Sequence, residues 1–305
     1  MDKKKIQIEY NEKIKIINQF NKFYYDDNNP KVSDLKYDEL KKEILLLESK
    51  YKFLNSKKSP SKIVGYKPSK NFKKIAHRIP MLSLANAFGK EDLINFEKKI
   101  HNYLSKSKDF ELSYSAEPKI DGISASLIYK NGEFRKGLSR GDGKEGEDIT
   151  ANLATIKDIP KIIKSKDFPE EIDIRGEVFI KNSEFKNLKE KFANPRNAAS
   201  GSLRQKNPDD TKKIPLKFIA YTFGYEKGLK VKNQIDFLKN LDNWGFKTNP
   251  LNKLVTGIDN LLINYSKIEK DRTKIDFDID GIVYKINNFE LQKRLGNVAN
   301  SPRWA

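Results

Sequence analysis

Apolar residues recur every three or four positions through the first part of the chain, the spacing of one face of an α-helix. Two such series are present: Tyr10, Ile14, Ile17, Phe20 and Tyr24, then Tyr37, Leu40, Ile44, Leu47 and Tyr51. The polar segment 26–30 between them predicts a turn, and Ser33 or Asp34 can cap the second helix. The pattern therefore predicts a small module of two helices within residues 1–55.

The pattern changes after a linker rich in Ser, Lys and Pro, residues 55–80. Strands are predicted over 123–129, 133–138, 172–180, 216–225 and 278–286, with a tight turn at Asn131-Gly132. Helices are predicted over 91–104, 183–192, 232–244 and 260–272. These elements do not alternate as βαβ units. We therefore expect an α+β fold with antiparallel sheets flanked by helices, divided into a helical module (1–70) and a second domain (71–305).

Composition narrows the chemistry that the chain can perform. The 305 residues include no cysteine and two histidines, His77 and His101, which excludes thiolate and histidine-cluster metal sites. Zinc is not expected, and a hard cation with oxygen ligands, such as Mg²⁺ or Mn²⁺, is the metal that this composition favours. No apolar run long enough to span a membrane and no secretory signal are evident, so no membrane partner is expected.

The formal charge of +18 predicts a polyanionic partner, although a general enrichment in lysine, asparagine and isoleucine is an alternative explanation. Arginine discriminates better, because nine of the 60 basic residues are arginines in a chain that otherwise prefers lysine. Arginine is retained where a planar, bidentate fork is needed. Several of the nine lie beside glycine turns or carboxylates, as a phosphate-binding site requires.

Lys119 is the candidate nucleophile. It ends an apolar run in Glu117-Pro118-Lys119-Ile120-Asp121-Gly122, with a carboxylate two residues away on each side. A lysine amine attacks an electrophile once it is deprotonated, which desolvation or neighbouring cations favour. The alternative is a surface turn in a lysine-rich chain, because Lys-x-Asp-Gly arises easily by chance.

Two glycine- or alanine-rich segments carry arginine. Residues 139–143 place two glycines around Arg140 and an aspartate, and the alternative is an ordinary hairpin end. Residues 192–204 combine small residues with Arg196 and Arg204. Small residues let backbone amides approach phosphates, and a tightly packed small-residue helix is the alternative there.

Two predicted strands carry charged residues. Arg175 and Glu177 share the polar face of 172–180, as a structural ion pair or as the floor of a ribose and phosphate site. In 278–285, Lys285 shares a face with Gly281, and its amine could cross the gap that the glycine leaves. Asp280 faces the other way unless a bulge intervenes.

Together these segments resemble the NAD-dependent DNA ligases of bacteria, from the N-terminal helices to Ala305. Seven elements occur in the family's order: Tyr37-Asp38, Met81-Leu82-Ser83-Leu84, Glu117-x-Lys119-x-Asp121-Gly122, Arg140-Gly141-Asp142-Gly143, Arg175-Gly176-Glu177, residues 194–204, and Asp278-x-Asp280-Gly281 to Lys285. The resemblance implies a helical module that binds nicotinamide mononucleotide (NMN), followed by an ATP-grasp-like nucleotidyltransferase (adenylation) domain.

The resemblance also implies a role for each matching residue. Lys119 attacks the adenylyl phosphate of NAD, releases NMN and becomes lysine–AMP, while Asp121 and Asp280 support Lys119 and the metal. Lys285 is catalytic and, with Ser83, Leu84, Glu117, Arg140 and Glu177, lines the nucleotide pocket. The nicotinamide half is bound by Tyr24, Tyr25, Asp34, Tyr37 and Asp38. Phosphate of NMN or of DNA is handled by Arg196, Arg204 and Arg272.

Two departures from the family pattern bear on these roles. Tyr25 stands where the family commonly has histidine, and the family continues beyond Ala305 with a lysine-bearing strand and DNA-encircling domains. We therefore expect self-adenylation without efficient sealing of nicked duplex DNA, in a monomer of the bacterial cytoplasm or nucleoid. The alternatives are an ATP-using ligase or capping-type nucleotidyltransferase, and a catalytically silent nucleic-acid-binding relative.

Overall fold

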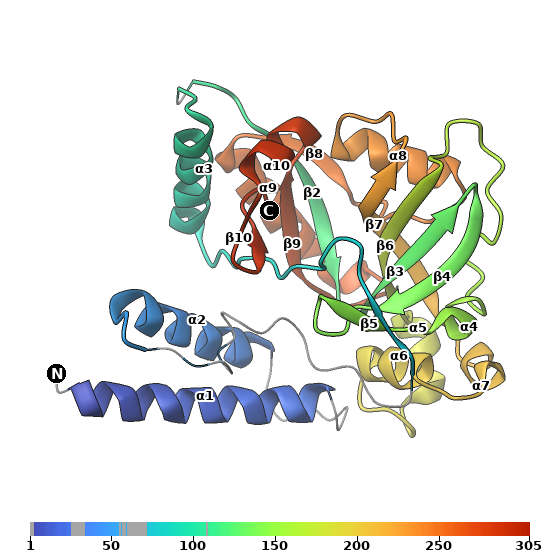
Figure 1. The fold of residues 1–305 in the computed structure, drawn as a ribbon, viewed down its shortest axis with the longest axis horizontal. Helices are drawn as coiled ribbons and strands as arrows, with labels where there is room; N and C mark the ends of the chain where they lie inside the picture. Colours follow the sequence, from blue (N-terminus) through green and yellow to red (C-terminus); the bar gives the residue numbers. More distant parts are fainter. Residues whose placement is uncertain (1–2, 26–33, 55, 57–58, 60–71, 108) are drawn as a thin grey trace.

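The computed structural model describes residues 3–25, 34–54, 56, 59, 72–107 and 109–305. Its first part consists of the two helices that the apolar spacing predicts, α1 (Lys3–Tyr25) and α2 (Asp34–Lys50), lying side by side (Figure 1). Tyr10, Ile17 and Ile44 are fully buried between them. The Tyr10 hydroxyl donates to Glu48 at 2.6 Å, which satisfies the polar end of a buried ring. The helical module is confirmed, whereas its predicted boundary near residue 70 lies outside the described residues.

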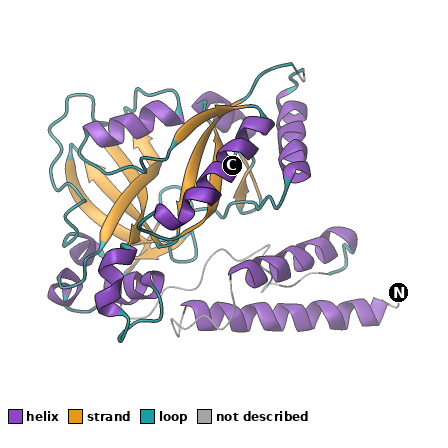
Figure 2. Cartoon of the chain, turned by 180° about the vertical axis from the view of Figure 1, so that it is seen from behind, coloured by secondary structure: helices purple, strands orange, loops and turns teal. Residues whose placement is uncertain are grey.

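Two antiparallel sheets form the centre of the remaining chain (Figures 1 and 2). The larger sheet has the order β4-β3-β6-β7 and the smaller one β8-β2-β9. Their strands are β2 (Ser113–Ile120), β3 (Ile123–Lys130), β4 (Glu133–Ser139), β6 (Glu171–Phe179), β7 (Lys217–Lys227), β8 (Lys253–Thr256) and β9 (Ile279–Ile286). The strands β2 and β3 follow each other directly, so Asp121 and Gly122 join the two sheets. The predicted α+β class with antiparallel sheets is confirmed.

Short pairs of strands and helices complete the domain. The strand β1 (Lys74–Ala76) pairs with β5 (Glu145–Glu147), and β10 (Asn297–Val298) pairs with β11 (Ser301–Pro302). The helices are α3 (Lys90–Leu104), α4 (Thr150–Leu153), α5 (Asn182–Phe185), α6 (Pro195–Leu203), α7 (Pro208–Lys212), α8 (Gln234–Asn243), α9 (Ile258–Asp271) and α10 (Phe289–Leu295), with 3₁₀ turns η1 (Lys186–Leu188) and η2 (Arg272–Lys274). One core cluster packs α4, α6 and α8 against the larger sheet, and a second packs α3, α9 and α10 against the smaller.

The hairpin turn between β3 and β4 has the predicted geometry. Asn131 and Gly132 both have positive φ, 51° and 76°, as a type I′ turn requires. A Cβ on Gly132 would lie 2.2 Å from the Ile163 carbonyl oxygen, so the turn packs where a side chain has no room. The turn therefore sets the pairing next to it, and the register of the two strands shifts between Ile128 and Tyr129.

Several elements differ from the predictions, among them α5 and β2. The helix predicted over 183–192 is shorter, because α5 ends at Phe185 and continues only as a 3₁₀ turn. The strand β2 was not predicted, since it contains Pro118 and is buried on both faces, so it shows no alternation. Pro118 is tolerated because β8 pairs with β2 only as far as Ala116, which leaves no partner on that side for a proline without an N–H.

Candidate active site

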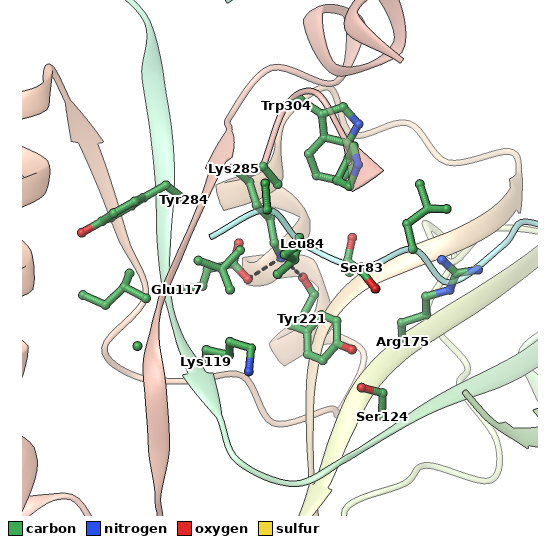
Figure 3. Close-up of a pocket in the computed structure, with 18 of the residues that line it drawn as sticks. Ser83, Leu84, Glu117, Lys119, Ser124, Arg175, Tyr221, Tyr284, Lys285 and Trp304 are labelled. Carbon is green, nitrogen blue, oxygen red and sulfur yellow. Dashed lines mark hydrogen bonds and ion pairs between the residues drawn. The ribbon is translucent and has the colours of Figure 1, made fainter. Parts of the chain in front are cut away.

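A cavity of about 1920 Å³ opens between the two sheets and reaches the helical module. Its walls come from residues 79–89, from β2 and β9 of the smaller sheet, and from β6 and β7 of the larger sheet. Lys119, Glu117, Lys285 and Tyr221 lie together in its interior, with Ser83 and Leu84 close by (Figure 3). The structure thus brings residues from distant segments of the chain into one cavity.

Lys119 reaches this cavity from a regular strand, not from a surface turn. It lies opposite Gly281 of β9. The register shifts at the next residue, where Ile120 pairs with Ile279 and Asp280 is left without a partner in the pairing. This bulge turns Asp280 toward β2, and its Oδ2 lies 2.5 Å from Lys119 Nζ. The Lys119 side chain is 46% exposed, so it remains accessible to a molecule in the cavity. The open question about Asp280 is resolved by the bulge.

Glu117 and Lys285 form a buried ion pair deeper in the cavity. Lys285 Nζ donates to Glu117 Oε2 at 2.6 Å and to the Tyr221 carbonyl at 3.0 Å, and both side chains are almost fully buried. Glu117 Oε1 accepts from Ser115 and from Gln234, at 2.8 and 3.0 Å. The predicted path of the Lys285 amine across the Gly281 gap is therefore not the one observed. The amine is directed to Glu117 on the neighbouring strand instead.

Asp121 and Arg196 form an ion pair next to Lys119, with 2.5 Å between Arg196 Nη1 and Asp121 Oδ1. Burial raises the pKa of the Asp121 carboxyl, Arg196 opposes that rise, and the negative charge of Asp280 reinforces it. Arg196 lies in the first turn of α6, which starts with Pro195 after the N-cap Asn194. The small-residue segment 194–204 is therefore a helix that presents Arg196 to the cavity.

Glu177 does not pair with Arg175, although both lie on the same face of β6. It accepts instead from the Ser124 hydroxyl at 2.8 Å. Burial raises the pKa of Glu177 to about 7, despite the opposing effects of Arg196 and Ser124. A carboxyl group that is half protonated near neutral pH therefore lies in the cavity wall.

Replacing Glu177 with glutamine is expected to change how stability depends on pH. Between its ordinary value and about 7, folded Glu177 binds a proton that the unfolded chain has released, so the free energy of unfolding falls as pH rises. This residue contributes a fall of up to about 3 kcal/mol between roughly pH 4.5 and 7.5. Urea unfolding of Glu177→Gln should lack that fall, whereas Glu190→Gln at an exposed position should keep it. If the free energy of unfolding changed with pH in the same way in the parent protein, Glu177→Gln and Glu190→Gln, the raised pKa of Glu177 would be contradicted.

Arg140 ties the segment 79–89 to the cavity. Its Nη2 donates to the Ser83 hydroxyl at 3.0 Å and to the Leu82 carbonyl at 3.3 Å. The Ser83 amide donates to Asn300 at 2.9 Å. The structure therefore brings Arg140, Ser83 and Leu84 together in the lining of the cavity.

Of the other predicted residues, some line the cavity, one does not, and the side chains of the rest are not described. Arg272 lines the cavity and donates to the Ile279 carbonyl at 2.6 Å. Arg204 does not line it, and its Nε lies 3.3 Å from Oε2 of Glu147, which is fully buried. Tyr37 lines the cavity where the helical module meets it, and its hydroxyl donates to Asn21 at 2.9 Å. The side chains of Tyr24, Tyr25, Asp34 and Asp38 lie outside the described part of the structure.

Tyr221, Ser124 and Gln234 are among the polar residues of the site that were not predicted. The Tyr221 ring lies 5.3 Å from Lys285 Nζ, Ser124 bonds Glu177, and Gln234 bonds both Glu117 and the Tyr221 carbonyl. Tyr221 belongs to the strand predicted over 216–225. Its place on the face of that strand that points into the cavity could have identified it as a site residue. Gln234 carries no such signal, because its partner Glu117 is 117 residues away.

A cavity between two antiparallel sheets, with a reachable lysine among carboxylates and arginines, defines a nucleotidyltransferase of the adenylation-domain class. A family model described as "NAD-dependent DNA ligase adenylation domain" matches residues 69–305, and one described as "DNA ligase-like, N-terminal NAD+-binding domain" matches residues 3–65. The chain therefore belongs to the NAD-dependent DNA ligases, and it comprises their NAD-binding and adenylation domains.

Similar proteins agree with this assignment. A DNA ligase of Pelagibacter ubique (strain HTCC1062) is 64% identical over the whole chain, which spans 45% of that protein. A DNA ligase of Bradyrhizobium sp. (strain ORS 278) is 43% identical over 93% of the chain and 41% of that protein. A solved structure of a mycobacterial DNA ligase D complexed with ATP and MES is 15% identical, covers 58% of this chain and 49% of that one, and has a TM-score of 0.36. This chain thus spans less than half the length of these DNA ligases.

Within the described ranges of residues, no group of three or more His, Cys, Asp or Glu side chains could hold a metal ion. Asp121 and Asp280 remain as hard oxygen donors close to Lys119, and Mg²⁺ is commonly held by one or two carboxylates together with substrate phosphates. The residues present therefore fit a cation that arrives with a phosphorylated substrate. None of the helices in these ranges is long and apolar enough to cross a membrane.

Proposed function

We propose that Lys119 is the nucleophile that takes AMP from NAD. The observation that carries the proposal is the position of Lys119 Nζ, in the cavity and 2.5 Å from Asp280 Oδ2. The amine is accessible, and Asp280 is an acceptor for the proton that must leave before attack. The neighbouring Asp121–Arg196 pair supplies a cation near the same point.

In this step the Lys119 lone pair forms a bond to the adenylyl phosphorus of NAD. The bond from that phosphorus to the bridging oxygen breaks, and its electron pair leaves with the phosphate of NMN. Lys119 loses one proton before attack and a second once the nitrogen–phosphorus bond has formed, and Asp280 accepts each in turn and passes it to solvent. Arg140 and Arg196 stabilise the charge on phosphate oxygens, since such transfers depend on positioning and electrostatics. Mg²⁺ or Mn²⁺, held by Asp280 and Asp121 with the substrate, would add to that neutralisation.

The helical module is proposed to bind the nicotinamide half of NAD. Tyr37, Asn21 and Lys41 line the same cavity as Lys119, and Lys42 Nζ lies 4.4 Å from the centre of the Phe88 ring. These contacts support a module that closes one end of the cavity, and ATP would leave that end without a ligand. The roles of Tyr24, Tyr25, Asp34 and Asp38 remain proposals of the resemblance, as does the division into residues 1–70 and 71–305.

The activity of a whole ligase is a further proposal. Lysine–AMP formation is the first step in sealing nicked duplex DNA during replication and repair, and the charge of +18 is consistent with DNA as a partner. Arg196, Arg204 and Arg272 are proposed to handle the phosphate of NMN or the DNA 5′-phosphate. From the resemblance to bacterial ligases, we also propose a monomer in the bacterial cytoplasm or nucleoid.

Labelled nucleotides test this function directly. The protein is incubated with Mg²⁺ and either NAD or ATP that carries label in the adenylate, and covalent label is measured after denaturation. We expect label from NAD and not from ATP. Label from ATP alone would identify an ATP-using nucleotidyltransferase instead. If neither nucleotide gives label but DNA is bound, a catalytically silent relative is the better description.

A further inference from the structure

We propose that Arg175 is a positioning residue that holds the strap, residues 79–84, at the distance from the larger sheet that NAD binding requires. The inference rests on the proposed function and deepens it. The strap has neither helix nor strand, yet all six of its residues line the cavity. Its place is therefore decided by contacts with the rest of the domain.

Arg175 makes two of those contacts. Its Nη1 donates to the Pro80 carbonyl at 3.2 Å and its Nη2 to the Ile79 carbonyl, so one guanidinium grips two consecutive peptide units. This uses the planar fork of arginine, and a lysine ammonium cannot reproduce it. Further along, Arg140 holds the Leu82 carbonyl and the Ser83 hydroxyl. Two arginines from separate parts of the chain, Arg175 and Arg140, thus hold the strap in place by hydrogen bonds.

Arg175 has an environment that a purely structural residue would avoid. It is only 8% exposed, and burial lowers the pKa of its guanidinium. Within the described residues no carboxylate forms an ion pair with it, because Asp173 bonds Arg78 instead, and its buried Nε has no hydrogen-bond partner. A buried cation without a paired anion is costly. Such a cost at the wall of a nucleotide cavity suggests a functional constraint on this residue.

Gly224 leaves room for the guanidinium. A Cβ at position 224 would lie 2.6 Å from Arg175 Nη2, 2.8 Å from Cζ and 2.9 Å from Nε. Gly224 does not have the positive φ that would require glycine for its backbone. The glycine is therefore needed for space, and Gly224→Ala displaces the guanidinium without changing its chemistry.

The test compares Arg175→Lys, Gly224→Ala and the combined variant in the labelling assay at varied NAD concentrations. We expect the half-saturating NAD concentration to rise about tenfold in each single variant, with the limiting rate within about twofold, because ground-state and transition-state binding weaken equally. The combined variant should have a half-saturating NAD concentration no higher than that of the more impaired single variant, since both changes act on one contact. Arg135→Lys is the control, because this arginine is exposed on β4 and does not line the cavity.

Equilibrium binding of NAD separates this inference from the proposed function. The same substitutions are placed in the Lys119→Ala protein, in which no covalent step occurs, and the dissociation constant for NAD is measured. A weakening of about tenfold would support the positioning role even if no label forms. Unchanged NAD affinity in the folded Gly224→Ala and Arg175→Lys proteins would overturn it, as would a loss confined to the limiting rate. If the parent protein binds no NAD, the proposed function fails and this inference fails with it.

Discussion

Replacing Lys119 with alanine is expected to reduce covalent labelling from NAD by at least about a thousandfold, because the attacking atom is lost. Lys119→Arg should be equally inactive, since a guanidinium stays protonated and has no lone pair for attack. The measurement is the amount of adenylate that stays covalently bound to the protein after incubation with labelled NAD and Mg²⁺ and denaturation at neutral or alkaline pH. Because Lys119 is half exposed, neither substitution should lower the free energy of unfolding by more than about 1 kcal/mol.

The control for this experiment is Lys136→Ala, at an exposed position of β4 outside the cavity. It should label as the parent protein does. If Lys119→Ala kept its label, the nucleophile would be another residue of this lysine-rich chain, and peptide mapping of the adenylated protein would identify it. Loss of label in both variants would indicate damage unrelated to the nucleophile.

Replacing Lys285 with methionine is expected to lower the free energy of unfolding by about 3–5 kcal/mol, because it leaves the Glu117 carboxylate buried without its cation. Glu117→Gln should be destabilising for the converse reason, since the Lys285 ammonium would keep only neutral oxygen partners. The double variant should lose much less than the sum of the two. A coupled buried pair has a large interaction energy in such a cycle. Urea unfolding monitored by tryptophan fluorescence measures all four proteins.

Additive losses in that cycle would show that the two residues stabilise the fold independently. Lys213→Met provides a matched control. Lys213 forms a solvent-exposed ion pair with Asp210, with 2.7 Å between Nζ and Oδ1, and such pairs contribute about 0–1 kcal/mol. The single variants should also lose labelling from NAD, since both side chains line the cavity that contains Lys119. Restored stability without restored labelling in the double variant would separate their structural role from their role in binding.

Local patterns were sufficient for much of the fold. The apolar spacing of Tyr10, Ile14 and Ile17 defines one face of α1, and Asn131-Gly132 sets the β3–β4 hairpin. Where the local pattern was absent, the prediction failed. The strand β2 is buried on both faces and contains a proline, so its sequence has neither alternation nor the residues typical of a central strand. That strand carries Lys119, the residue on which the proposed chemistry depends.

The class of fold, the family and the candidate nucleophile follow from the order and spacing of motifs along the chain. Which charged side chains meet depends instead on how the chain folds. The bulge after Lys119 brings in Asp280 from 161 residues away, Arg196 pairs with Asp121, and Arg204 pairs with Glu147 outside the cavity. A strand register that shifts by one residue exchanges the two faces of a strand. Lys119 thus has its partners because of how β2 and β9 align, which no local stretch of sequence specifies.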